Sequence, residues 1–225
     1  MVGDINIFDG LARSLSNATD AIVISVDYRK GPVHPYPAAV DDCYAAFVWA
    51  AQNAGSLGGD ASKLVVAGDS AGGNLAAVVA LKARDEHGPK IAAQILYYPA
   101  TDLTTKSYPS KEKFGDGYGL SKEEEKVYHQ SYVANADPTQ PYLSPLYASS
   151  LAHLPPALVF TEGFDPLTDA TKLYIARLKY EGVAVTWQSY PGMIHGFMSV
   201  PLFKQRRDAL NRTHDFLAQT LGTPR

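Results

Sequence analysis

The sequence predicts an α/β protein in which helices flank a mostly parallel sheet. Short apolar runs typical of buried strands alternate along the chain with longer segments that have helical spacing. One such run leads into an alanine-rich helical segment through Gly68-Asp-Ser-Ala-Gly72, which fits the pattern G-x-S-x-G. The chain has 225 residues, of which 46% are hydrophobic, and this suffices for the core of one domain over residues 1–225.

Strands and helices alternate in the first part of the chain. Residues 21–27 form an almost continuous apolar run, which indicates a strand that is covered on both faces. Further apolar runs predict strands over 64–67 and 91–97. Apolar residues at helical spacing predict helices over 8–18, 38–54 and 72–86. This order of elements predicts a parallel sheet with helices on its faces.

The C-terminal part continues the same order. Strands are expected over 157–161 and 183–190, and helices over 167–182 and 202–220. We expect loops directly after the two strands, over 162–167 and 191–197, because both segments contain glycine and proline.

Residues 103–150 differ in character from the rest, with lysines and a glutamate followed by a glycine-rich bend. A helix is predicted to begin after Ser121, because Ser121 and Glu124 have the spacing of a capping box. A connection of this length is uncommon inside a compact domain. We therefore expect 103–150 to be a lid or cap inserted between strands. The alternative is a decorated loop with no part in binding.

Composition bears on several classes of function. The net charge of −3 and the lack of a basic cluster argue against nucleic acid as a partner. No apolar run approaches the ~18 residues needed to span a bilayer. The single cysteine, Cys43, lies among apolar residues of a predicted helix, so we expect a core residue and not a reactive thiol. The start of the chain shows no charged-then-apolar signal segment, so the expected location is cytoplasmic.

Three reactive side chains follow predicted strands. Ser70, Asp165 and His195 each fall just after an expected strand, in that order along the chain. In an open parallel sheet, ligands bind at the edge formed by the carboxyl ends of the strands. The fold itself can therefore bring the three side chains together.

These residue types suit nucleophilic catalysis. A serine hydroxyl is a poor nucleophile unless a base takes its proton, and histidine, with an ordinary pKa of about 6.5, suits that task near neutral pH. His195 would take the proton of Ser70, and Asp165 would hold the imidazole in the required tautomer. The product would be an acyl-serine, which water then hydrolyses. No cluster of residues has the spacing of a metal site.

Each of these residues also has a purely structural interpretation. The segment 68–72 could be an ordinary turn between strand and helix, and a lone histidine in a glycine-rich loop is more often structural than catalytic. Asp165 could cap the helix that follows, and Glu162 and Asp169 are rival acids. Asp69 is expected to be a structural residue of the turn, since its side chain leaves next to the serine. The conjunction of the three residues with the turn favours catalysis.

Further motifs extend the pattern over nearly the whole chain: Val26-Asp-Tyr-Arg29, His34-Pro-Tyr-Pro37, Gly68-Asp-Ser-Ala-Gly-Gly-Asn74, Asp165-Pro-Leu167 and His195-Gly-Phe197. With these motifs the chain resembles the hormone-sensitive-lipase-like (family IV) carboxylesterases of the α/β-hydrolase superfamily. The resemblance implies an α/β-hydrolase fold and cleavage of small carboxylic esters with short or medium acyl chains, without a cofactor. It also implies Ser70, Asp165 and His195 as the catalytic triad and residues around 103–150 as part of a cap.

The chain departs from that family at its start. Members carry an H-G-G-G motif ahead of the region that resembles Gly3-Asp4, and the 225 residues contain no such motif. In the family its glycines supply two donors to the oxyanion, which would leave mainly the N–H of Ala71. The missing segment would also include the first three strands, the third of which lies between those at 21–27 and 64–67. We therefore expect a fragment with weak stability, a partial cap and reduced activity.

Alternatives to an esterase remain open from the sequence. The same triad could hydrolyse amides or peptides. The chain could also be a non-catalytic small-molecule receptor on a hydrolase scaffold, although such receptors tend to lose the catalytic histidine and His195 is present. The last strand, 183–190, would lie at a sheet edge, so a homodimer formed through that strand is open as well.

Overall fold

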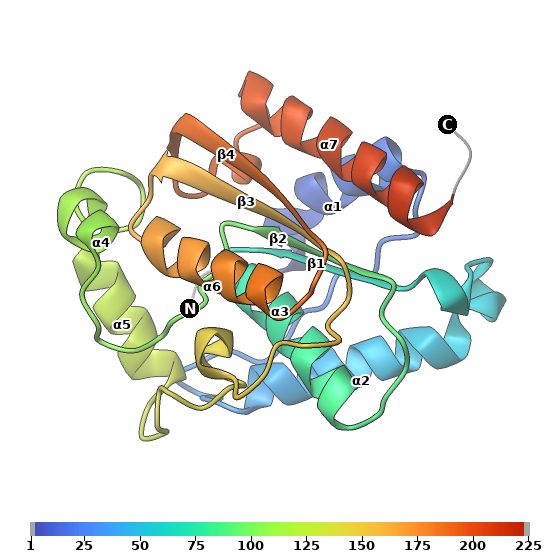
Figure 1. The fold of residues 1–225 in the computed structure, drawn as a ribbon, viewed down its shortest axis with the longest axis horizontal. Helices are drawn as coiled ribbons and strands as arrows, with labels where there is room; N and C mark the ends of the chain where they lie inside the picture. The colour runs from blue at the N-terminus through green and yellow to red at the C-terminus, as the bar shows by residue number, and fades with distance from the viewer. Residues whose placement is uncertain (1–2, 223–225) are drawn as a thin grey trace.

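Within residues 3–222, which the computed structural model describes, four strands form a sheet in the middle of the protein (Figure 1). In both chain order and spatial order they are β1 (Val65–Asp69), β2 (Ala93–Tyr97), β3 (Ala157–Phe164) and β4 (Val185–Ile194). Every neighbouring pair is parallel. The carboxyl ends of all four strands therefore meet at one edge of the sheet.

Helices cover both faces of the sheet (Figure 1). One face carries α1 (Ile5–Thr19) and α7 (Lys204–Leu221), which contact each other. The other face carries α3 (Ala71–Asp85) and α6 (Thr168–Tyr180), with α2 (Ala38–Asn53) packed on α3. Beyond the carboxyl ends of the strands lie α4 (Pro109–Phe114) and α5 (Lys122–Tyr132). Single 3-10 turns are η1 (Gly55–Leu57), η2 (Ala61–Lys63), η3 (Pro145–Tyr147) and η4 (Phe197–Ser199).

Capping side chains mark the first turns of α1 and α5. Ser121 and Glu124 form the expected capping box: the Ser121 hydroxyl accepts from the Glu124 amide at 3.2 Å, and the Glu124 carboxylate accepts from the Ser121 amide at 2.8 Å. Asp4 caps α1 in a similar way by accepting from the amides of Asn6 and Ile7. The helices predicted from apolar spacing are confirmed, with bounds that differ by a few residues.

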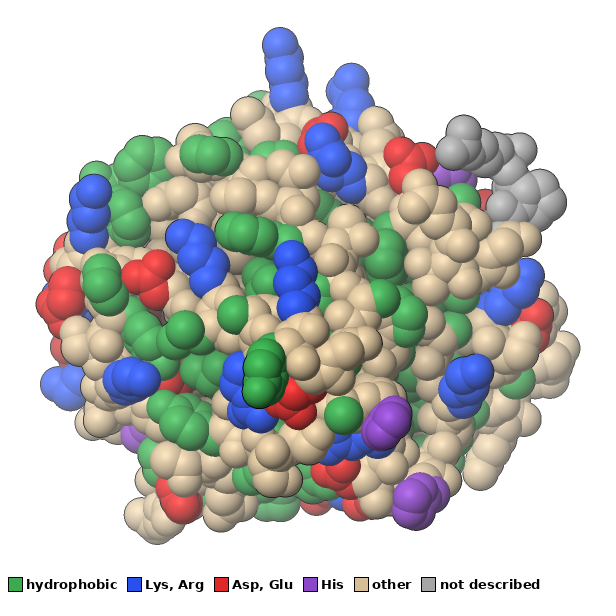
Figure 2. All heavy atoms as spheres, viewed as in Figure 1, with side chains coloured by type: hydrophobic (Ala, Val, Ile, Leu, Met, Phe, Trp, Pro, Cys, Tyr) green, Lys and Arg blue, Asp and Glu red, His purple; other side chains and the backbone are tan. Residues whose placement is uncertain are grey.

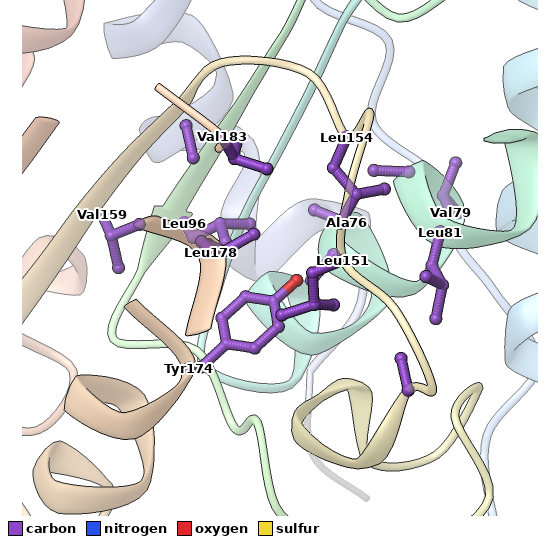
Figure 3. Packing of buried hydrophobic residues seen from close by; sticks show 14 of the residues in the cluster. Ala76, Val79, Leu81, Leu96, Leu151, Leu154, Val159, Tyr174, Leu178 and Val183 are labelled. Carbon is purple, nitrogen blue, oxygen red and sulfur yellow. The ribbon is translucent and has the colours of Figure 1, made fainter. Parts of the chain in front are cut away.

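The larger apolar cluster lies between the sheet and the helices α3 and α6 (Figure 3). Its side chains come from the helices, from the strands and from the segment that leads into β3; they include Ala76, Val79, Leu81, Leu96, Leu151, Leu154, Val159, Tyr174, Leu178 and Val183. Successive residues of β3 alternate between this cluster and a second one beneath α1 and α7, where Leu158 and Phe160 are buried. Both faces of β3 are covered, which accounts for its continuous apolar run.

The predicted strand over 21–27 is wrong. The segment has no strand pairing in the described part of the chain, and the side chains of Ile22, Val23 and Ile24 are exposed. Among the described residues the sheet ends at β1, and β1 pairs only with β2. An apolar run forms a buried strand only where a neighbouring strand accepts its backbone hydrogen bonds, and none of the described residues supplies one here.

Two strands extend further than expected, into segments predicted to be loops. β3 continues to Phe164 and β4 to Ile194, with a shift of register between Glu162 and Phe164. Gly163 permits this pairing, because a Cβ at that position would lie 2.0 Å from the carbonyl oxygen of Pro191. Pro191 is tolerated within β4 because β4 is an edge strand, where a missing amide donor costs little.

Cys43 is half-buried against two apolar clusters, and burial raises the pKa of its thiol to about 12, which disfavours the reactive thiolate. No helix among residues 3–222 is long and apolar enough to cross a membrane. On the face in Figure 2, lysine and arginine side chains are scattered and do not gather in one patch.

The contrast between β2 and the segment 21–27 can be tested with one type of substitution. Ile95→Ala removes a side chain that is 2% exposed in β2 and is expected to lower the free energy of unfolding by about 2–5 kcal/mol. Ile22→Ala, at a position that is 56% exposed, is expected to cost less than about 1 kcal/mol. Urea unfolding followed by circular dichroism measures both. Equal costs would contradict the exposed placement of 21–27.

Candidate active site

Ser70 occupies a sharp corner between β1 and α3. Its φ of 55° and ψ of −115° are unusual for a residue with a side chain, and such strain costs about 1–3 kcal/mol. Hydrogen bonds hold the corner: the Ser70 amide donates to Tyr97 O at 2.9 Å, and the Ser70 carbonyl accepts from the Asn74 amide at 3.0 Å. The corner places the serine at the carboxyl edge of the sheet.

Glycine allows the backbone to pack closely at this corner. A Cβ on Gly68 would lie 2.2 Å from the carbonyl carbon of Gly72, and a Cβ on Gly73 would lie 3.0 Å from Pro99. A Cβ on Gly72 itself would meet only the Asp69 carboxylate, at 3.9 Å. Of the two glycines in the G-x-S-x-G pattern, Gly68 is therefore required by close packing, whereas position 72 has room for a side chain; the other tight position is Gly73.

Ser70, His195 and Asp165 form a continuous chain of hydrogen bonds. The Ser70 hydroxyl lies 2.8 Å from Nε2 of His195, and Nδ1 of His195 lies 2.9 Å from Oδ2 of Asp165. Asp165 follows β3 and is 1% exposed, and His195 follows β4. The structure therefore brings together the three residues that the sequence placed after strands.

The competing acids have other surroundings. Asp169 accepts a hydrogen bond from the Ser110 amide of α4 at 2.9 Å. Glu162 is buried on β3, and its carboxyl group faces Asp165. Among the acids considered, Asp165 is the one that bonds to the imidazole. Its second oxygen accepts from the Leu167 amide at 2.8 Å, next to the start of α6.

The predicted oxyanion donor and its neighbour also lie at this corner. Ala71 is the first residue of α3, where the initial amide groups have no partner within the helix. Asp69, the last residue of β1, is beside His195, and burial raises the pKa of its carboxyl group. No hydrogen bond between Asp69 and His195 is formed in residues 3–222, in line with the expected structural position of Asp69.

Tyr98 is a neighbour of the imidazole that sequence reasoning missed. Its ring contacts the His195 ring edge-on, with 5.0 Å between the centroids. Its hydroxyl accepts from the Met198 amide at 3.3 Å and donates to Asp69 at 3.4 Å. Burial raises the pKa of Tyr98 well above its ordinary value, so the hydroxyl stays neutral. The sequence offered one indication of this position: Tyr98 directly follows the predicted strand 91–97, and the ends of parallel strands lie at the same edge as Ser70.

Asn74 is a second residue whose position the sequence did not explain. It is buried in α3, and its side-chain amide donates to Ala100 O at 2.6 Å and to Leu143 O at 2.8 Å. These bonds connect the helix that follows Ser70 to two segments distant in the sequence. The sequence offered one indication of this role: Asn74 is the one polar residue among the otherwise small and apolar residues 71–81.

Residues 103–150 approach the site from the carboxyl edge of the sheet. A Cβ on Gly119 would lie 3.0 Å from the carbonyl oxygen of His195, so the glycine-rich bend packs directly on that loop. Phe114 and Tyr118 contact Phe164, with ring centroids 5.5 and 5.3 Å away, just before Asp165. An apolar aromatic group therefore borders the three hydrogen-bonded residues.

Comparisons with known proteins agree with this geometry. A family model described as "alpha/beta hydrolase fold" matches residues 1–199. The chain is 43% identical to carboxylic ester hydrolase LipN and 40% identical to carboxylesterase NlhH, both of Mycobacterium tuberculosis, over 88% and 89% of its own length. It spans only 54% of the former and 64% of the latter.

Solved structures show the same similarity. An esterase from Pyrobaculum calidifontis superimposes with a TM-score of 0.93 at 38% identity, over 99% of this chain and 74% of that one. A carboxylesterase from a metagenomic library, EstE1, gives a TM-score of 0.93 at 38% identity, over 99% of this chain and 76% of that one. The fold, the serine corner and these matches together show that the chain belongs to the hormone-sensitive-lipase-like carboxylesterase family of the α/β-hydrolase fold.

Proposed function

We propose that the chain is a serine esterase that hydrolyses small carboxylic esters with short or medium acyl chains. The observation that carries this proposal is the chain of hydrogen bonds from Ser70 through His195 to Asp165, at 2.8 and 2.9 Å. Relatives named as esterases, at about 40% identity, support the substrate class.

In this mechanism the three residues have different tasks. Ser70 attacks the ester carbonyl while His195 accepts its proton, and His195 then gives that proton to the departing alcohol. Asp165 orients the imidazole and stabilises its charged form. Water, activated by His195, hydrolyses the acyl-serine and restores the free hydroxyl. The contacts to both nitrogens of His195 support these assignments, and no step requires a cofactor.

The tetrahedral oxyanion needs backbone donors close to Ser70. We assign one donor to the amide of Ala71, at the positive end of α3. The glycines that the family uses for the other donors have no counterpart in the 225 residues. Because one missing donor costs about 10²–10³ in rate, we propose that residues 1–225 turn over esters more slowly than their longer relatives.

Residues 103–150 are proposed to be a partial cap within a single domain of residues 1–225. The packing of Gly119 on the His195 loop and the aromatic contacts of Tyr118 with Phe164 support this role. A cap in this position would contribute the side of the pocket that receives the acyl or alcohol group.

A cytoplasmic location is proposed as well, supported by the single cysteine, which leaves no intramolecular disulfide.

Two alternatives share the same site. An amide or peptide hydrolase would use the same three residues, and a receptor would bind a small molecule without reaction. His195 in hydrogen-bond contact with Ser70 favours catalysis over binding alone. Parallel assays with p-nitrophenyl butyrate and the matching p-nitroanilide separate ester from amide hydrolysis.

A homodimer formed through β4 is proposed from its place in the sheet. β4 is an edge strand, and its Thr186 and Trp187 side chains are exposed. Sedimentation velocity of residues 1–225 is expected to show a dimer that Thr186→Lys converts to monomers, since a lysine opposes pairing of two edges. A wild-type chain that is monomeric at all concentrations, or a dimer that tolerates Thr186→Lys, would contradict this arrangement.

The esterase proposal is tested by turnover of p-nitrophenyl butyrate. Ser70→Ala is expected to lower kcat by at least about 10³, because the acyl intermediate can no longer form. The exposed Ser56→Ala serves as a matched control and is expected to leave turnover unchanged. A Ser70→Ala variant that keeps full activity would refute the mechanism.

A further inference from the structure

Glu162 is a buried carboxyl group next to the candidate active site for which hydrolysis provides no task. It lies on β3 and is 1% exposed, and neither side-chain oxygen accepts a hydrogen bond from any donor in the described part of the chain. Its backbone is fixed, because its carbonyl accepts from the hydroxyl of Thr168 at 2.7 Å. A carboxylate in such surroundings would lose its hydration without compensation.

The groups around Glu162 favour its neutral form. Its carboxyl group faces that of Asp165, and the phenol of Tyr98 lies on the same side of the sheet. On β4 its register partner is Tyr190, whose hydroxyl donates to Asp208 and not to Glu162. Burial and the neighbouring Asp165 raise the pKa of Glu162 well above its ordinary value, and no cation among the described residues acts in the opposite direction.

A neutral carboxyl group has one O–H to donate, and the Asp165 carboxylate is the acceptor that it faces. Each oxygen of Asp165 already accepts one hydrogen bond, from the Leu167 amide at 2.8 Å and from His195 Nδ1 at 2.9 Å. A carboxylate oxygen has room for a second hydrogen bond. A third donor would fix the plane of the Asp165 carboxylate against the imidazole.

We propose that Glu162 is a positioning residue, whose protonated carboxyl group donates a hydrogen bond to Asp165 and so holds Asp165 in place for His195. The proposal rests on the proposed esterase function, since it assigns a partner to the acid of that triad. It differs from a catalytic role, because the Glu162 carboxyl group forms no hydrogen bond with Ser70 or with the imidazole in the described structure.

The proposal fixes the sign of an effect on His195. A donor to Asp165 withdraws negative charge from that carboxylate, so removing the donor stabilises the imidazolium and raises the pKa of His195. An ionised Glu162 would do the opposite, because removing its charge would lower the pKa of His195. The other carboxyl groups that face His195 are Asp69 on β1 and Glu124 on α5, and they stay unchanged in every variant.

Three chains of residues 1–225 test the proposal: wild type, Glu162→Gln, which keeps a donor, and Glu162→Ala, which does not. Glu162→Ala is expected to lower kcat/KM for p-nitrophenyl butyrate about tenfold to a hundredfold, whereas Glu162→Gln loses far less. The acid limb of the kcat/KM profile is expected to move to higher pH in Glu162→Ala and to stay in place in Glu162→Gln. Glu123→Ala, which removes an exposed carboxylate of α5, is the control and should leave the limb unmoved.

Two further measurements need no turnover. They therefore test the role of Glu162 even if the chain hydrolyses no ester, and the failure of one proposal can be told from the failure of the other. In the first, the His195 imidazole is titrated by NMR without substrate. Its pKa should be higher in Glu162→Ala than in the wild type, and unchanged in Glu162→Gln. Infrared spectra of the wild type at neutral pH should contain a carboxylic-acid carbonyl band that Glu162→Gln removes. The proposal is overturned if that band is absent, if Glu162→Gln lowers the pKa of His195, or if Glu162→Gln is as slow as Glu162→Ala.

Discussion

The strained backbone of Ser70 is the constraint on which the candidate site depends. A positive φ at a residue with a side chain persists only where the surroundings fix it, and here Tyr97 O and the Asn74 amide hold the corner from both sides. Gly68 makes the close approach of the helix backbone sterically feasible. The corner directs the hydroxyl to the edge of the sheet where Asp165 and His195 follow β3 and β4. The three residues therefore meet because of one strained residue and the parallel order of the strands.

The paired strands and the apolar segment 21–27 differ in how well they are buried. From β2 to β4 the strands are paired, and β2 and β3 are covered on both faces. The three hydrogen-bonded residues lie at the ends of β1, β3 and β4. The apolar segment 21–27, in contrast, stays outside the sheet, with exposed isoleucines. The chain spans 54% and 64% of the lengths of the two curated relatives named above.

Local patterns predicted most of the fold and all three residues of the hydrogen-bonded chain. The helices, the capping box at Ser121 and the order of strands follow from spacing and turn residues, which act over a few positions. Sequence patterns gave wrong predictions where pairing between distant strands decides the structure. Among the described residues, segment 21–27 has no neighbouring strand to pair with. β3 and β4 extend beyond the predicted strand ends, because Gly163 lets their backbones approach closely at Pro191. The roles of Tyr98 and Glu162 could not be predicted for the same reason, because their contacts depend on which strands lie side by side.

Covalent labelling of Ser70 tests most directly whether this corner is a working nucleophile. Residues 1–225 treated with a fluorophosphonate, digested and analysed by mass spectrometry are expected to carry about one adduct per chain, on the peptide that contains Ser70. Labelling should slow strongly in His195→Ala, because the hydroxyl then lacks the base that takes its proton. A folded wild-type chain that stays unlabelled, or is labelled at another residue, would contradict the assignment of Ser70 as the nucleophile.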